Sequence, residues 1–247
     1  MFLLLLSLID LRGALNVEEN NGLKFRHEYK YVISDIDLAL LKSRIKNIMQ
    51  LDEHATEQGY SIRSLYFDDY YNRCFLENEN GTDPREKFRI RIYNHSTDNI
   101  KLECKRKERG KTYKTSCPLT IEQVKTLMSG RPLSDVANQH PVLQKLTKEM
   151  LLRHMRPVII VEYDRVPYVY QNGNVRITFD TNISSSTEIK SFLDENIKKR
   201  PIMGAGQKLL EVKYDEFLPD HIKQSLQLQN LQYTAFSKYY NCRKYKF

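Results

Sequence analysis

Charged and apolar residues alternate in several short segments of this chain. Residues 87–93 read KFRIRIY, where every second position is lysine or arginine until the final tyrosine. Residues 100–118 read IKLECKRKERGKTYKTSCP, in which Lys101, Glu103 and Lys105 alternate with apolar side chains. Because successive side chains of a strand point to opposite faces, each segment predicts a strand with one charged and one apolar face. The apolar face belongs in a core, whereas the charged face is either solvated or lines an anion-filled cavity.

The same alternation predicts strands along most of the chain. We predict them over residues 25–33, 61–67, 87–93, the part of 100–118 before Gly110, 111–117, 156–166 with a continuation at 168–169, 174–182 and 208–214. Residues 77–85 and 94–99 are predicted to be turns or loops, since the first contains the Asn80-Gly81 and Asp83-Pro84 turn signals.

Three segments change to the helical period. Ser34 followed by Asp37 resembles a capping box and starts a predicted helix that runs to about residue 51. Residues 120–152 predict two short helices around a break at 130–132, and residues 219–231 predict another. Residues 235–245 are basic and aromatic and close the chain. We find no internal repeat, so we expect one domain over residues 23–247 after a frayed or disordered segment, 1–22.

Composition limits the possible partners and settings. The 39 lysines and arginines exceed the 31 acidic residues, which indicates either a solvated basic surface or an anionic partner such as nucleic acid, phospholipid or polyphosphate. The four cysteines show no CxxC pair and no metal-ligand spacing, which favours a reduced, cytoplasmic protein. Residues 1–9 are apolar but much shorter than the roughly 20 residues that span a bilayer. We therefore expect no integral membrane segment.

Collected over the predicted strands, the charged faces carry many cations and few carboxylates. They are Arg26, Lys30, Arg89, Arg91, Lys101, Lys105, Lys114, Arg176 and Lys213, with Glu28, Glu103, Asp180 and Glu211. A charged face on one antiparallel strand is ordinarily a wet outer face. If the sheet closes into a barrel with these residues inside, the interior must hold water and a polyanion, because burying an unpaired ion costs several kcal/mol. Such an interior suits phosphate chains, and its carboxylates either pair with cations or hold a divalent metal.

Seven short motifs also follow one another in the order of a known family. They are RxExK at 26–30, SLYFD at 64–68, RxRxY at 89–93, ExKxK with GKxxK at 103–114, YxR at 163–165 with VRITFDT at 175–181, LEVK at 210–213 and FSKY at 236–239. Over nearly the whole chain it resembles the VTC-type polyphosphate polymerase domain of the triphosphate tunnel metalloenzymes, a CYTH-like superfamily. The resemblance implies an α+β fold in which an antiparallel β-barrel forms a tunnel with helices packed outside.

The resemblance implies an activity and a set of site residues. The expected enzyme is a phosphotransferase that moves the terminal phosphoryl group of a nucleoside triphosphate, such as ATP, to a polyphosphate chain with Mn²⁺ or Mg²⁺. The expected catalytic residues are Lys30, Arg89, Arg91, Lys105, Lys114, Arg165, Arg176 and Lys238. Further substrate-binding residues are Arg26, Lys101, Lys111, Lys213 and Ser237. Glu211 and Glu28 are the expected metal ligands, while Glu103 is expected to orient its neighbours.

The chain departs from the related families in two ways. Related triphosphatases and cyclases open with ExExK, but Arg26 replaces the first glutamate here, and fewer carboxylates favour transfer over water activation. We also find neither an SPX module nor terminal membrane helices, as in stand-alone bacterial members. Three functions remain open: a polyphosphate polymerase, a tripolyphosphatase or organic triphosphatase, and a non-catalytic polyphosphate- or nucleic-acid-binding module. Nucleic acid is disfavoured because base-stacking motifs are missing, and a membrane partner is left undecided.

Overall fold

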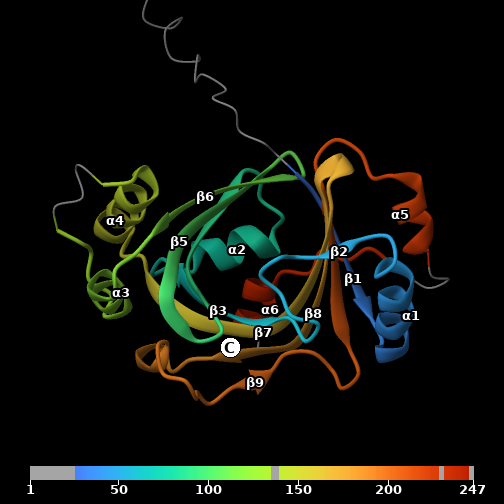
Figure 1. The fold of residues 1–247 in the computed structure, drawn as a ribbon. Helices are drawn as coiled ribbons and strands as arrows, with labels where there is room; N and C mark the ends of the chain where they lie inside the picture. The colour runs from blue at the N-terminus through green and yellow to red at the C-terminus, as the bar shows by residue number, and fades with distance from the viewer. Residues whose placement is uncertain (1–25, 135–138, 228–230, 245–247) are drawn as a thin grey trace, which may run out of the picture.

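One antiparallel sheet curls around on itself and forms the body of the molecule (Figure 1). The computed structural model describes residues 26–134, 139–227 and 231–244, so the segment expected to be frayed, 1–22, lies outside the described residues. The main strand order is β1-β10-β8-β7-β3-β4-β5-β6, with β2 paired to β7 and β9 paired to β8. The predicted antiparallel barrel with packed helices is confirmed.

The described residues form ten strands, six α-helices and two short 3-10 helices. The strands are β1 His27–Ile33, β2 Gln50–Leu51, β3 Tyr60–Asp68, β4 Arg85–Tyr93, β5 Ser96–Glu108, β6 Lys111–Pro118, β7 Arg156–Tyr170, β8 Val175–Ser186, β9 Arg200–Pro201 and β10 Lys208–Tyr214. The helices are α1 Asp35–Ile45, α2 Arg73–Glu79, α3 Ile121–Met128, α4 Pro141–Arg153, α5 Asp220–Ser225 and α6 Lys238–Lys244, with 3-10 helices at Asn172–Asn174 and Ile189–Ser191.

The two outermost strands of the sheet meet at a short bridge. The Arg26 amide donates a hydrogen bond to the Thr112 carbonyl oxygen at 3.2 Å, and the Thr112 amide donates to the Arg26 carbonyl oxygen at 3.3 Å. This bridge joins the start of β1 to β6. The curled sheet is therefore closed at this point. The charged faces of its strands line the enclosed space.

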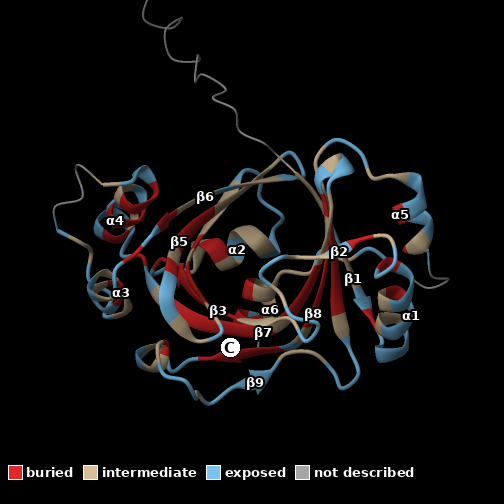
Figure 2. Cartoon of the chain, viewed as in Figure 1, coloured by how far each residue is buried: buried red, intermediate tan, exposed pale blue. Residues whose placement is uncertain are grey.

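Helices cover the apolar outer faces of the strands (Figure 2). One core lies between β1, β8 and β10 and the helices α1 and α5, and includes Leu41, Phe179 and Ile222. A larger core continues to α3 and α4, with Leu127 and Leu146 among its buried residues. The alternation that predicted these strands thus separates helix-covered outer side chains from charged inner ones.

The helices α2 and α6 lie within the outline of the curled sheet in Figure 1 rather than on its outer side. The segment predicted as a turn, 77–85, begins with the last residues of α2. Asp68 explains this helix: its carboxylate accepts hydrogen bonds from the amides of Cys74 at 2.8 Å and Phe75 at 3.2 Å, and from the Tyr239 hydroxyl of α6. Both helices are thereby held to the end of β3.

Other element boundaries move for reasons of strand pairing. The helix predicted to run from 34 to about 51 ends at Ile45, and β2 then pairs with Tyr168 and Val169 of β7. The predicted loop 94–99 is mostly strand, because Asn94 and His95 turn tightly with φ of 50° and 57°. Positive φ at both central residues is the requirement of a two-residue hairpin turn.

Two further expectations concern cysteines and membrane helices. All four cysteines are buried free thiols. Among the described residues no helix combines the length and the apolar character needed to span a bilayer.

Candidate functional site

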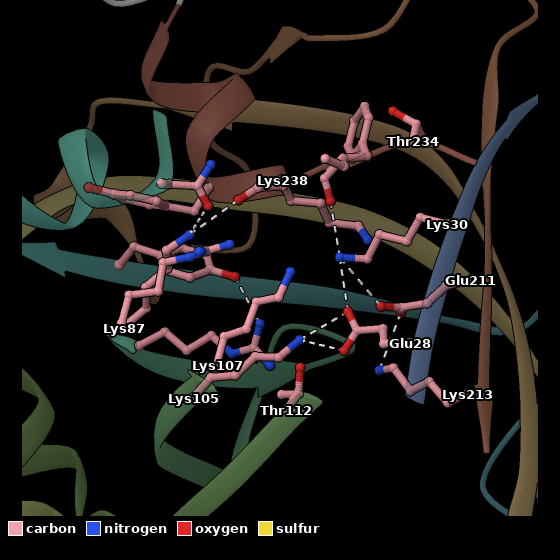
Figure 3. Close-up of a pocket in the computed structure, with 18 of the residues that line it drawn as sticks. Glu28, Lys30, Lys87, Lys105, Lys107, Thr112, Glu211, Lys213, Thr234 and Lys238 are labelled. Carbon is pink, nitrogen blue, oxygen red and sulfur yellow. Dashed lines mark hydrogen bonds and ion pairs between the residues drawn. The ribbon is translucent and has the colours of Figure 1, made fainter. Parts of the chain in front are cut away.

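A cavity of about 450 Å³ lies inside the curled sheet. Ten cationic side chains and three carboxylates line it, supplied mainly by β1, β4, β5, β7, β10 and the segment 233–239. Figure 3 shows that side chains from these elements converge on one space. A cavity with such an excess of fixed positive charge is suited to a polyanion.

Lys30 occupies the centre of a group of charges formed by two paired strands. Lys30 lies opposite Glu211 in the β1–β10 register, and Glu28 lies opposite Lys213. The Lys30 Nζ is 2.9 Å from a Glu28 oxygen and 3.7 Å from a Glu211 oxygen, and it donates to the Phe236 carbonyl oxygen at 3.0 Å. Burial lowers the pKa of Lys30, but the two carboxylates outweigh burial and raise that pKa above its ordinary value.

Glu28 and Glu211 remain ionised in this group. Burial raises the pKa of Glu28, but Lys105 and then Lys30 outweigh it and hold the pKa well below its ordinary value. Lys105 Nζ lies 3.0 and 2.8 Å from the two Glu28 oxygens. For Glu211, burial also raises the pKa, while Lys213 lowers it below the ordinary value.

The two glutamates are the cavity's best candidates for metal ligands. They come from adjacent strands and lie close enough that Glu28 raises the pKa of Glu211. The described residues include no cluster of three or more His, Cys, Asp or Glu side chains that could hold a metal. Mg²⁺ and Mn²⁺ prefer oxygen ligands, and Mg²⁺ is commonly bound by one or two carboxylates with phosphate oxygens and water. The donor set therefore fits a metal that is shared with a phosphate ligand.

Two further acids lie behind the cavity and position its cations. Glu103, 1% exposed, is 2.7 Å from Arg89 Nε and 2.6 Å from Arg89 Nη2. Asp180, fully buried, accepts hydrogen bonds from Arg165 at 2.6 and 2.8 Å and pairs with Lys238 Nζ at 2.5 Å. These contacts fix the guanidinium groups before any ligand arrives. Burial raises the pKa of Glu103 and of Asp180, but their cationic partners hold both values below the ordinary range.

The sequence of this chain places it in a family. A model of the VTC domain matches residues 25–247. The chain belongs to the VTC domain family. No curated protein matches it.

Among solved structures, the chain is similar to HpAC1 from Hippeastrum, a proposed adenylyl cyclase described as having a dominant triphosphatase activity. The two share 12% identity, the match covers 91% of this chain and 97% of HpAC1, and the TM-score is 0.52. It is also similar to a proposed adenylate cyclase from Bacillus halodurans, with 13% identity, coverage of 83% and 87%, and a TM-score of 0.46. At such low identity, the likeness to HpAC1 shows a shared fold alone.

Ten of the residues expected to form the site of this VTC domain line the cavity. They are Lys30, Arg89, Arg91, Lys105, Arg165, Lys238, Lys213, Ser237, Glu28 and Glu211. Their convergence from separate elements follows from the inward alternation of β1, β4, β5, β7 and β10, together with the segment before α6. Their roles in binding or catalysis remain predictions.

Five expected residues do not line the cavity. Lys114 reaches Glu103 at 3.1 Å, Arg176 pairs with Asp52 at 3.1 Å, and Arg26 pairs with Asp215 at 2.7 Å. Lys101 lies opposite Arg91 in the β4–β5 register, and Lys111 is exposed at the start of β6.

Seven basic or tyrosine residues line the cavity without having been predicted to, among them Tyr233 and Tyr239. The five that are basic or contact a predicted arginine are Arg85, Lys87, Lys107, Tyr66 and Tyr163. The alternation contained the signal for two of them, because Lys87 shares a strand face with Arg89, and Lys107 follows Lys105 by two positions. The tyrosine hydroxyls accept hydrogen bonds from Arg89 at 2.8 Å and from Arg91 at 3.3 Å, which no local pattern indicated.

Proposed function

We propose that this VTC domain is a polyphosphate polymerase that transfers the terminal phosphoryl group of ATP or another nucleoside triphosphate to a polyphosphate chain. The observation that carries the proposal is the cavity itself, in which ten cations and three carboxylates surround a space of about 450 Å³. Its lining, within the described residues, includes no histidine or cysteine. Such a site is equipped to hold phosphates rather than to form a covalent intermediate through those side chains.

Phosphoryl transfer makes limited demands on the protein. The reaction needs the two substrates held in line and the charge on the transferred group offset. An oxygen of the acceptor chain's terminal phosphate forms the new bond to the γ-phosphorus, and the bond from that phosphorus to the β-bridging oxygen breaks. The nucleoside diphosphate leaves and the chain is longer by one phosphate. No side chain is required as a nucleophile.

The lining residues divide this work according to their chemistry. Arg89 and Arg165 suit two-point grips on phosphate oxygens, and their buried partners Glu103 and Asp180 hold the guanidinium planes in place. Lys30, Lys105 and Lys238 supply point charges around the same space. Such preset cations stabilise the charge that develops on the transferred group.

Glu28 and Glu211 would hold the divalent metal, Mn²⁺ or Mg²⁺. When bound, that ion would neutralise part of the charge of the phosphate oxygens. Lys105 and Lys30 keep Glu28 ionised, Lys213 and Lys30 keep Glu211 ionised, and ionised carboxylates are the form that binds metal.

A triphosphatase is the second candidate. The specific observation in its favour is the shared fold with HpAC1, described as having a dominant triphosphatase activity. Against it, Arg26 stands where related triphosphatases carry a glutamate, and it pairs with Asp215. A metal-activated water is harder to build with fewer carboxylates.

Product analysis separates the candidates. The purified protein would be incubated with ATP and Mn²⁺ and the products resolved on a polyphosphate gel. Long chains support the polymerase, free phosphate alone supports the triphosphatase, and no turnover supports a non-catalytic binding module.

A further inference from the structure

The ten cations of the cavity fall into two groups according to their partners. Seven have a carboxylate within 4.0 Å: Lys30, Arg89, Arg91, Lys105, Arg165, Lys213 and Lys238. The other three, Arg85, Lys87 and Lys107, have no carboxylate partner within that distance among the described residues. The mutual repulsion of three neighbouring cations is relieved when an anion binds among them.

These three cations lie together at one end of the cavity, which we call the unpaired basic end. Arg85 lies opposite Lys107 in the β4–β5 register, and Lys87 lies opposite Lys105. In Figure 3, Lys87 lies across the cavity from Glu211 and Lys213. Lys87 and Lys107 both neighbour Lys105, which pairs with Glu28 at 2.8 Å, so the unpaired basic end adjoins the pair of glutamates that suits a metal.

Lys87 is held by neutral groups only. Its Nζ donates to the Asn78 Oδ1 at 2.5 Å and to the Ser237 Oγ at 3.3 Å, and lies 5.1 Å from the centre of the Tyr239 ring. The Lys87 ammonium group has three N–H donors, and these two hydrogen bonds leave one N–H free to donate to a ligand. The side chain is thus fixed in place without a carboxylate partner.

The charged groups facing Lys87 are mainly cationic. Burial disfavours the charge of Lys87 most, and Arg85 on its own strand, Lys105 on β5 and Lys30 on β1 add to that effect. The nearby Cys74 thiol on α2 keeps its proton, because burial raises its pKa. Two carboxylates of α2 lie near this end. Burial raises the pKa of Glu77, Lys87 slightly opposes that rise, and Glu77 pairs with Arg73 at 3.9 Å. Glu79 lines the cavity and accepts a hydrogen bond from the Tyr240 hydroxyl at 3.1 Å.

We propose that Arg85, Lys87 and Lys107 form a second phosphate-binding subsite that holds the acceptor polyphosphate chain without a metal ion. The proposal rests on the function proposed above, because that reaction needs two phosphate substrates in one cavity. A metal-bound triphosphate suits the end with Glu28 and Glu211. A linear polyphosphate carries negative charge along its whole length and needs cations that no carboxylate has already neutralised.

Binding of the polyphosphate chain is coupled to the uptake of a proton. Burial, followed by Arg85, lowers the pKa of Lys87 to about 7. At pH 8, with the cavity empty, Lys87 is therefore a neutral amine in most molecules. An entering phosphate favours the ammonium form, so Lys87 takes a proton from solvent as the chain binds. Other lysines of the cavity can also take up protons when the chain binds. Comparing the wild type with Lys87 variants isolates the proton uptake that is due to Lys87.

The test is titration calorimetry of the full chain with inorganic polyphosphate of uniform length, at pH 8 with EDTA and no nucleotide. We expect Lys87→Gln to weaken binding about 10- to 100-fold, which corresponds to the loss of one hydrogen bond to a charged group. Lys87→Arg keeps the positive charge and should bind within a few-fold of the wild type. The matched control is Arg106→Gln on β5, whose side chain pairs with Glu108 and Glu86 and does not line the cavity.

Repeating the titrations in buffers of different ionisation enthalpy measures the linked protons. The wild type should take up more protons per bound chain than Lys87→Arg, whose guanidinium is already charged. Wild-type affinity in Lys87→Gln, or equal proton uptake in the wild type and Lys87→Arg, would overturn the subsite. If ATP is hydrolysed without chain growth while Lys87→Gln still weakens metal-free polyphosphate binding, the polymerase assignment fails and this binding site stands.

Discussion

The cavity residues with the sharpest predicted effect are Glu211 and Lys30, because the proposed metal site depends on both. Glu211→Gln keeps the shape of the side chain but removes the carboxylate charge, and Lys30→Ala removes the cation that contacts Glu28 and Glu211. We expect turnover of ATP to fall about 100-fold or more in each, with the far-UV circular dichroism unchanged. The control is Glu86→Gln. Glu86 pairs with Lys145 at 2.6 Å and does not line the cavity. Wild-type rates in either cavity variant would refute the assignment.

The buried carboxylate of Asp180 is predicted to contribute to the stability of the fold. Asp180→Asn removes the fully buried carboxylate that pairs with both Arg165 and Lys238. Arg165 keeps Glu211 at 3.2 Å, whereas Lys238 loses the one ion pair it forms among the described residues. Breaking a buried pair by removing one partner costs about 3–5 kcal/mol, so the free energy of unfolding measured in urea should fall by that amount. Glu108→Gln removes only a half-exposed pair with Arg106 and should cost about 0–1 kcal/mol. An equal loss in the two variants would contradict the role of Asp180.

The alternation of charged and apolar residues predicted which face of the sheet a charged side chain lies on better than whether it lines the cavity. Lys101 shares a strand face with Lys105 but lies four residues before it in β5, and only Lys105 lines the cavity. Arg176 lies opposite the cavity residue Lys213 in the β8–β10 register, but its side chain pairs with Asp52 instead of lining the cavity. Since a strand rises about 3.3 Å per residue, four residues amount to about 13 Å. A local pattern gives the side of the sheet and cannot give the position of the cavity along it.

Among the elements, the start of α1 was readable from sequence and forms as predicted. The Ser34 side chain accepts a hydrogen bond from the Asp37 amide at 3.1 Å, and the Ser34 amide donates to the Asp37 carboxylate at 2.9 Å. We expect Ser34→Ala to lower the free energy of unfolding by about 1 kcal/mol. Because α1 lies outside the sheet, polyphosphate binding should not change. A loss of binding would show that α1 affects the cavity.

The helices α2 and α6 could not be predicted in the same way. Both depend on Asp68, which is nearby in sequence to α2 but 171 residues from Tyr239. The Asp68-Asp69 pair reads locally as a turn, and nothing in the local pattern indicates the distant hydroxyl. Sequence patterns of short range therefore predicted the strands other than β2 and β9, and the outer helices. The end of the cavity near α2 depends on contacts between remote segments.

For the whole molecule, the buried acids predict how stability responds to acid. Glu28, Glu103 and Asp180 have pKa values below the ordinary values of 4.5, 4.5 and 3.8. The unfolded chain therefore binds protons first as pH falls, so the stabilisation is fully present well above pH 4.5 and is lost progressively below it. The free energy of unfolding should decrease steadily between about pH 5 and pH 3. A flat profile in that range would contradict the charge network.

The central claim is that the cavity lengthens polyphosphate at the expense of a nucleoside triphosphate. The most direct measurement supplies the purified protein with Mn²⁺, a polyphosphate primer and ATP labelled in its γ-phosphate, and follows the label by gel with time. We predict that label enters chains longer than the primer while ADP accumulates in equal amount. Label recovered only as free phosphate, with the primer unchanged in length, would contradict this account.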